Sequence, residues 1–270
     1  MSDTKQSTTV RLAELGGEDV AGRPLTGDEV DVKMPGCSIL SVLSENSYGK
    51  NFLAYQGFMG RFLLLRVLKK EMCDDSWVFL KAPKIVAMHH ENIAEYYDVV
   101  EMENELYVLT EHFPVLMTLA SLLKRYGAFS IPIAQRVLLD VAKGLAYLVE
   151  KQVGAWSLTP EHICLFYESS ELPQNSDELF LDVETVMKIN DYGLPCQGME
   201  SKDLTANFQE LAETIERMIG GFEKAPPQLQ GIIENLRTGK YEDALAFLRD
   251  VESLVNGKKA WLFRWFGKRG

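Results

Sequence analysis

The sequence predicts an α+β protein in which a mostly β half precedes a mostly helical half. Two observations support this prediction. Between residues 37 and about 70, short apolar runs alternate with turn residues, as they do in consecutive strands. After residue 115 the apolar residues instead recur at helical spacing. This change of period indicates two lobes, at residues 37–111 and 116–257, joined by a short connection.

The first lobe is predicted to contain five strands and one helix. "CSILSVLSE", "KNFLAYQG" and "RFLLLRVLKK" indicate three antiparallel strands, and a hairpin around Glu103 and Asn104 adds two more. The stretch between them has a helical pattern with Pro83 inside it. Because proline in a helix interior costs about 3 kcal/mol, we expect this helix to be short, broken or late to begin.

The second lobe is predicted to be helical except for one strand. A helix over "TLASLLKRYG" ends at Gly127, and a longer helix follows with Ser130 as its N-cap. An apolar stripe marks the buried face of the longer helix: Ile133, Val137, Val141, Leu145 and Leu148. Residues 178–193 are expected to return to a strand. Three more helices are expected within 207–221, 227–239 and 241–257.

The composition is that of an ordinary globular protein, with 46% hydrophobic residues and a net charge of −11. This charge argues against nucleic acid as a partner, because phosphate binding requires a basic face. The four cysteines are scattered, so neither a disulfide framework nor a metal site is predicted. With no signal-peptide pattern and no apolar run of about 18 residues, we expect a cytoplasmic protein.

Two segments flank the predicted lobes. Residues 1–36 are polar and rich in glycine and proline, which predicts a flexible arm. Its hydroxyl residues are either unmodified or phosphorylated and read by a phosphothreonine-binding domain; they are Thr4, Ser7, Thr8 and Thr9. Residues 258–270 mix basic and aromatic residues, including Trp261, Arg264, Trp265 and Phe266. This tail either contacts an anionic membrane or a partner, which would make the protein peripheral to the membrane, or docks back onto the helical lobe.

Short motifs occur in the same order as the predicted elements. "LSENSYGKN" precedes "LLLR", "HHENI" follows the predicted helix, and "VGAWSLTPEHICL" precedes "KINDYGL". They resemble the glycine loop, the V-A-I-K strand, the H-P-N-I turn, the catalytic loop and the D-F-G turn of protein kinases. The resemblance, to bacterial serine/threonine kinase domains in particular, covers residues 38 to about 255. It implies a bilobal protein kinase-like fold with a shortened C-lobe.

The nucleotide-binding motifs differ from the family pattern. In the glycine loop Gly49 remains, but Ser44 and Asn46 replace the first two glycines. Side chains there obstruct the close approach of backbone to phosphates. The resemblance places Arg66 at the phosphate-binding lysine. It places Lys81, or Ala82 after a shift of one residue, at the glutamate that pairs with it.

The catalytic loop has also lost the residues that carry the chemistry. Ser157 stands at the aspartate that acts as base, and a serine cannot take that role near pH 7. His162 stands at the metal-binding asparagine, although magnesium prefers oxygen ligands. Ala155 and Thr159 replace the loop histidine and lysine, and we expect Trp156 to pack into the former site.

Three residues remain weak candidates for nucleotide contact. Thr110 occupies the gatekeeper position, and Asp191 is the metal-binding aspartate that the sequence keeps. We expect Arg66 to turn to the Asp191 carboxylate, because each would otherwise be a partly buried charge without a partner. ATP binding is therefore expected to be weak or absent, and no bound cofactor or metal is predicted.

The segment after the D-Y-G turn is short. The family's D-x-x-x-L-G helix corresponds to "NFQELAETIERMIGG", with Asn207 for the aspartate and Ala212 for the glycine. Residues 194–206 leave little room for a substrate platform, and no A-P-E motif occurs. We therefore expect a pseudokinase that binds a signalling protein as a scaffold or regulator. The alternative hypotheses are an atypical kinase or transferase, or an ATP-sensing switch, using Arg66 and Asp191.

Overall fold

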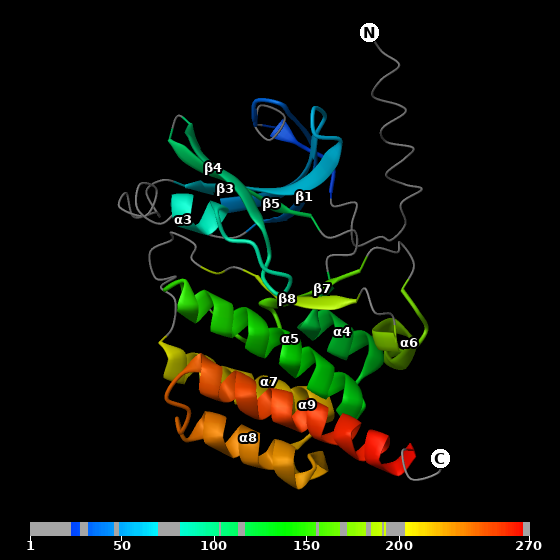
Figure 1. Cartoon of the computed structure of the whole chain (residues 1–270). Helices are drawn as coiled ribbons and strands as arrows, with labels where there is room; N and C mark the ends of the chain where they lie inside the picture. Colours follow the sequence, from blue (N-terminus) through cyan, green and yellow to red (C-terminus); the bar gives the residue numbers. More distant parts are fainter. Residues whose placement is uncertain are drawn as a thin grey trace.

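The computed structural model places a β-rich lobe over a helical lobe, as the sequence predicts (Figure 1). It describes residues 23–27, 32–45, 49–69, 82–102, 104–112, 117–154, 157–167, 172–181, 185–190, 192 and 203–266, with side chains up to Asn256 in the last helix. Among these residues, no helix combines the length and the apolar character needed to cross a bilayer.

The N-lobe contains a five-stranded antiparallel sheet, which confirms the predicted fold. The strands are β1 (Cys37–Glu45), β2 (Gly49–Gln56), β3 (Arg61–Lys69), β4 (Tyr96–Met102) and β5 (Glu105–Glu111). Their order is β1-β2-β3-β5-β4. The strands β3 and β4, which are consecutive in the chain, therefore lie on either side of β5. The helix α3 (Ala82–Val86) has Pro83 in its first turn, where proline is tolerated.

One face of this sheet is covered by residues from the segment predicted to be a flexible arm. Met34 is buried in a cluster with Phe52, Leu63 and Leu65, while Leu25 and Val32 pack against the same cluster. The backbone of Arg23 exchanges two hydrogen bonds with Val42 at the edge of β1, both 2.9 Å long. The packed structure therefore begins before the boundary predicted at residue 37. The hydroxyl residues of the arm lie outside the described residues.

The C-lobe is built mainly from helices, as predicted. They are α4 (Leu119–Tyr126), α5 (Ile131–Glu150), α6 (Ser176–Leu181), α7 (Leu204–Ile219), α8 (Pro227–Arg237) and α9 (Ala244–Phe266). The five residues of the apolar stripe on α5 are all buried, and α9 packs along this helix (Figure 1). Thr118 caps α4 through its side chain, and Gly127 ends it with φ of 75°.

Three details of the helical lobe differ from the sequence predictions. The hydroxyl of Ser130 does not cap α5 but donates to Asp177 at 3.3 Å. Residues 178–181, predicted as strand, belong to α6, and the strand is confined to β8 (Val186–Ile189). The backbone of α9, predicted to end near Gly257, continues as a helix to Phe266. Neither Gly257 nor the basic residues that follow it interrupt the helix.

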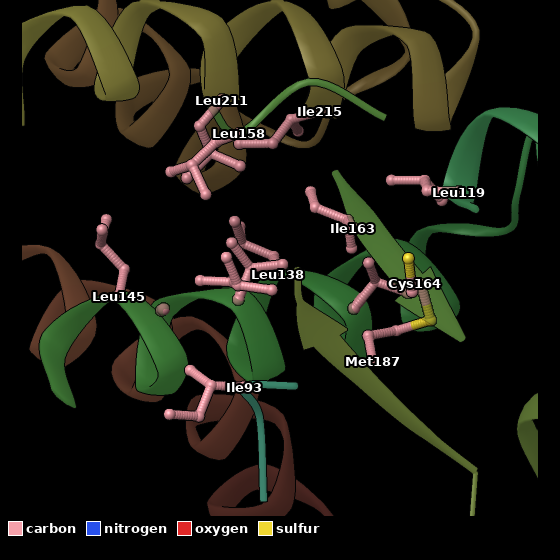
Figure 2. Close-up of a cluster of buried hydrophobic side chains, with 14 of the residues drawn as sticks. Ile93, Leu119, Leu138, Leu145, Leu158, Ile163, Cys164, Met187, Leu211 and Ile215 are labelled. Carbon is pink, nitrogen blue, oxygen red and sulfur yellow. The ribbon is translucent and has the colours of Figure 1, made fainter. Parts of the chain in front are cut away.

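A small second sheet lies between the N-lobe and α5. It contains β6 (Met117–Thr118), β7 (Ile163–Phe166) and β8 in that order, all antiparallel. Side chains of this sheet belong to the main hydrophobic core, and Figure 2 shows Ile163, Cys164 and Met187 in the buried cluster that also contains Leu119 and Leu138. The loop before β7 and the turn after β8 are thereby placed at the junction of the two lobes.

Candidate functional site

The loop that corresponds to the kinase catalytic loop is tied to α7. Ser157, at the position of the family's base, is only 4% exposed, and its hydroxyl donates to the Glu210 carboxylate at 2.8 Å. The same carboxylate oxygen accepts the backbone N–H of Leu158 at 3.1 Å. The hydroxyl of Ser157 is therefore used in an internal hydrogen bond between the loop and a helix of the C-lobe.

A second side chain of α7 completes this anchor. The hydroxyl of Thr214 donates to the carbonyl of Leu158 at 2.9 Å, so both backbone groups of Leu158 are bound by α7. Glu210 and Thr214 are four residues apart, which places them on one face of the helix. Sequence reasoning missed this pair because it assigned the family's aspartate to Asn207. The Asn207 amide donates to the carbonyl of Asp203, the N-cap of the same helix, at 3.3 Å.

Thr159 and His162 interact with each other. The Nδ1 atom of His162 lies 2.9 Å from the Thr159 hydroxyl, and its backbone N–H donates to the Thr159 carbonyl at 3.0 Å. The His162 carbonyl then accepts the N–H of Asn190 at 2.8 Å. The two residues that stand for the family's lysine and asparagine thus form a local turn that connects the loop to the end of β8.

Arg66 reaches across the lobe junction. The residue is 6% exposed, and its Nη2 donates to the Asn190 side-chain oxygen at 3.4 Å. Asp191, its predicted partner, lies outside the described residues. The structure therefore brings Arg66 to the residue next to Asp191. The guanidinium lies where the resemblance implies a phosphate-binding lysine.

Two retained family positions have structural explanations. A Cβ atom on Gly49 would lie 2.0 Å from the Val67 carbonyl oxygen, so the close pairing of β2 and β3 requires glycine there. Thr110 is 1% exposed and pairs with Leu64 on β3 and Tyr96 on β4 inside the sheet. Both residues support the packing of the N-lobe, whatever the protein binds.

A buried ion pair joins the lobes at the end of β5. The ammonium of Lys188 on β8 lies 2.8 Å from both carboxylate oxygens of Glu111, whose backbone follows Thr110. The side chains are 12% and 9% exposed. Glu111 also accepts the N–H of Glu95 at 2.9 Å, and Lys188 lies 4.7 Å from the centre of the Phe166 ring. The carboxylate therefore has partners from both lobes, as a buried charge requires. Sequence reasoning did not single out either residue.

The tyrosine of the D-Y-G turn is locked against the N-lobe. The Tyr192 hydroxyl donates to the Ala94 carbonyl at 2.5 Å, and the Tyr96 hydroxyl donates to the Tyr192 carbonyl at 3.1 Å. Their rings meet edge to face with centroids 4.9 Å apart. Burial raises the pKa of Tyr192 well above its usual range, so the hydroxyl stays protonated and continues to donate.

Two buried titratable groups lie near the junction. Burial lowers the pKa of His112, just after β5, to about 4, so the ring is neutral at pH 7. Burial raises the pKa of Asp140 on α5 to about 6, although its carboxylate accepts the N–H of Met187 at 3.1 Å. His112 therefore titrates near pH 4 and Asp140 near pH 6, and Asp140 in addition bonds to the backbone of β8.

Several predicted site residues lie outside the described residues. They are Asn46, Lys81, Ala155, Trp156 and Asp191, together with the side chains of Trp261, Arg264, Trp265 and Phe266. In the part of the chain that the structure describes, no three His, Cys, Asp or Glu side chains gather in a way that could hold a metal ion. The candidate site therefore consists of Arg66, Thr110, Ser157, Thr159 and His162, held by Glu210, Asn190 and the Lys188–Glu111 pair.

The family model described as "Protein tyrosine and serine/threonine kinase" matches residues 63–214, which is more than half of the 270-residue chain. The chain belongs to the protein kinase family. The match runs from β3 to the last turns of α7, so it includes the junction residues described above and the catalytic-loop region with its substituted positions.

Relatives of known sequence or structure agree with this assignment. Serine/threonine-protein kinase BCK1/SLK1/SSP31 of Saccharomyces cerevisiae is 28% identical over 120 residues, which are 44% of this chain and 7% of that protein. The chain thus spans a small part of that relative. The PknI kinase domain of Mycobacterium tuberculosis is structurally similar with a TM-score of 0.61 at 14% identity, covering 82% of this chain and 97% of that domain. Rad53 1-466, solved in complex with AMP-PNP, gives a TM-score of 0.63 at 12% identity, covering 79% and 64%. These structural similarities confirm the kinase-like fold.

Proposed function

We propose that this protein is a pseudokinase, a kinase-like domain that binds a signalling partner as a scaffold or regulator instead of transferring phosphate. The observation that carries the proposal is the state of Ser157. At the position of the base it is buried, and its hydroxyl donates to Glu210 on α7. A kinase base must accept a proton from a substrate hydroxyl, whereas this hydroxyl is neither basic near pH 7 nor directed to a substrate.

The surroundings of Ser157 support the same proposal. Arg66, which would hold the nucleotide phosphates, donates to Asn190 across the lobe junction. The ring nitrogen of His162, which would stand at the metal, contacts Thr159. Gly49, the glycine kept from the phosphate-binding loop, is needed for the close approach of β2 to β3. Each of these residues stands at a position that contacts nucleotide or metal in active kinases, and each makes a contact within the protein instead.

Phosphate transfer provides the direct test. The full chain is incubated with ATP and either magnesium or manganese, with and without a generic protein substrate. Phosphate incorporated into the chain or the substrate is then measured by mass spectrometry. We expect no incorporation above that of the Asp191→Ala variant. Incorporation by the wild-type chain that the Asp191→Ala variant abolishes would overturn the proposal and favour an atypical kinase or transferase.

Nucleotide sensing without turnover is a second candidate, favoured by the buried guanidinium of Arg66 at the junction, since this group suits phosphate geometry. It is tested by thermal unfolding with ATP. A ligand at 100 times its Kd stabilises a fold by about 2.7 kcal/mol. We expect no shift in Tm for the wild type or for Arg66→Lys, which restores the family residue. A saturable shift in the wild type would favour the sensor.

We also propose that residues 258–270 attach the protein to an anionic bilayer or to a neighbouring protein. The helix α9 continues to Phe266 into this basic, aromatic segment, while the whole chain carries a charge of −11. Near an anionic surface each cation contributes about 1 kcal/mol. Cosedimentation with phosphatidylserine vesicles at low and high salt should depend on the tail. Equal recovery without residues 258–270 would exclude the membrane. Phosphorylation of the arm at its hydroxyl residues stays a prediction.

A further inference from the structure

The turn between β2 and β3 presents two adjacent apolar side chains to solvent. Phe58 is 96% exposed and Met59 is 58% exposed. In the part of the chain that the structure describes, the other large apolar residues that are exposed, Val149 and Leu245, lie singly on two different helices, at 37% and 50%. Single exposed apolar residues are common on protein surfaces, but an adjacent pair at the end of a hairpin requires an explanation.

Folding does not account for these two residues. The turn is closed by the N–H of Met59 donating to the Gln56 carbonyl at 3.2 Å and by the N–H of Gly60 donating to the Gly57 carbonyl at 3.3 Å. Gly60 supplies the positive φ of 66° that the turn needs. Polar residues at positions 58 and 59 would permit the same backbone. A phenyl ring that is 96% exposed gains almost no packing within the protein.

The hairpin holds this tip in place. Gln56 pairs with Arg61 and Tyr55 with Phe62 in regular register, and the Tyr55 and Phe62 rings lie 5.1 Å apart. The Nε atom of Arg61 donates to the Gln56 side chain at 2.9 Å, and its guanidinium lies 3.5 Å from the centre of the Tyr97 ring. A braced tip loses little conformational freedom on binding, which favours its use as an anchor.

The charge of the hairpin indicates the kind of surface that it fits. Residues 49–69 contain four cations and no acidic residue, although the chain as a whole carries a net charge of −11. Of these cations, Arg66 is buried at the lobe junction and Lys50 is paired with Glu45. Arg61 is the cation beside the tip, and its planar guanidinium is suited to a carboxylate. A bilayer is the poorer fit, because one cation beside the tip contributes about 1 kcal/mol while the acidic body is repelled from anionic lipids.

We propose that Phe58 and Met59 form the anchor of a protein-binding surface and insert into an apolar pocket that has acidic residues at its rim facing Arg61. An exposed aromatic residue beside a flexible thioether matches the anchors that dominate the binding energy of protein interfaces. The proposal extends the scaffold role proposed above. Its test reads binding, whereas the test of that role reads phosphate transfer, so either can fail without the other.

The partner can be found by cross-linking in the cells that make the protein. Benzoylphenylalanine is introduced at position 58 of the full chain, and at position 245 on α9 as the matched control. We expect a discrete protein adduct from position 58 that position 245 does not give. The identified protein, once purified, should bind Phe58→Ser about 30-fold more weakly than the wild type, the change that corresponds to a 2 kcal/mol anchor. Leu245→Ser should bind like the wild type.

Several outcomes would overturn the proposal. They are the absence of an adduct specific to position 58, an adduct with a second copy of this chain, or a partner whose affinity does not change in Phe58→Ser. Cosedimentation with phosphatidylcholine and phosphatidylserine vesicles that Phe58→Ser abolishes would assign the tip to a membrane instead. Both serine variants should keep the wild-type Tm, because the replaced side chains are exposed, so a loss of binding reports on the surface and not on folding.

Discussion

Replacing Lys188 by methionine should destabilise the protein strongly, because the change leaves a buried carboxylate without its cation. The ammonium lies 2.8 Å from both oxygens of Glu111, and the two side chains are 12% and 9% exposed. Removing one partner of such a pair costs about 3–5 kcal/mol, mostly from the uncompensated charge. The N–H of Glu95 still donates to the carboxylate, which places the expected loss nearer the lower value.

The assay is urea unfolding at neutral pH, followed by tryptophan fluorescence and far-UV circular dichroism. Urea unfolding should show a loss of about 3 kcal/mol in the free energy of unfolding. In thermal unfolding, for a chain of this size, the same loss lowers Tm by roughly 6–12 °C. The matched control is Lys143→Gln, which breaks a pair of similar length, 3.1 Å to Glu91, but with side chains 36% and 62% exposed. Solvent screening reduces the value of such a pair, so the control should change the unfolding free energy by less than about 1 kcal/mol.

A double-mutant cycle separates the ion pair from other effects of the substitution. Lys188→Met combined with Glu111→Gln should be less destabilised than the sum of the two single variants, because no buried charge remains unpaired. If Lys188→Met loses no more stability than Lys143→Gln, or if the two changes at the pair are additive, the pair does not hold the lobes together and the reasoning is wrong.

Three further predictions concern the same framework. Gly144→Ala should destabilise the protein by about 1–3 kcal/mol, because the new Cβ would lie 2.5 Å from the Asn92 carbonyl oxygen. Gly231→Ala, in a helix with open space around it, should stabilise the protein, and thermal unfolding of both variants measures the difference. Glu210→Ala should cost about 1–3 kcal/mol in urea unfolding by freeing Ser157 and Leu158, and no loss would contradict the anchor. The folded-state pKa of His112, about 4, lies below its unfolded value, so the contribution of this ring to stability should fall as pH drops from about 6.5 to 4, while Asp140, with its pKa raised to about 6, opposes the fall. Over this range His112→Gln should gain roughly 3 kcal/mol relative to the wild type, and an unchanged difference between the two would refute the assignment.

The sequence by itself determined the order of the elements and the family. Alternation of apolar residues over 37–70 and helical spacing after 115 depend on local geometry, so they can be read without contacts. The same is true of the short helix α3, where Pro83 lies in the first turn and acts on its own turn. The substitutions at Ser157, Arg66 and His162 are also visible in the sequence, because the motifs around them set the alignment.

Errors arose where a residue has more than one suitable partner. Ser130 precedes a helix and was expected to cap it, yet its hydroxyl donates to Asp177, which is distant in the sequence. Residues 178–181 are apolar enough for a strand, and a run this short cannot distinguish strand from helix by periodicity alone. The cover on the N-lobe sheet was missed for a related reason. Met34 and Val32 are isolated apolar residues in a polar segment, and their burial depends on the sheet beside them.

Only the tertiary structure decided how the substituted site is held. The carboxylate that binds Ser157 comes from Glu210, and the cation that binds Glu111 comes from Lys188, a residue 77 positions away. Neither pair has a sequence signature, because a side chain selects its buried partner by position in space and by the cost of leaving a polar group unpaired. Local patterns therefore predicted the lobes and the substituted positions, whereas long-range packing determined what the remaining polar groups contact.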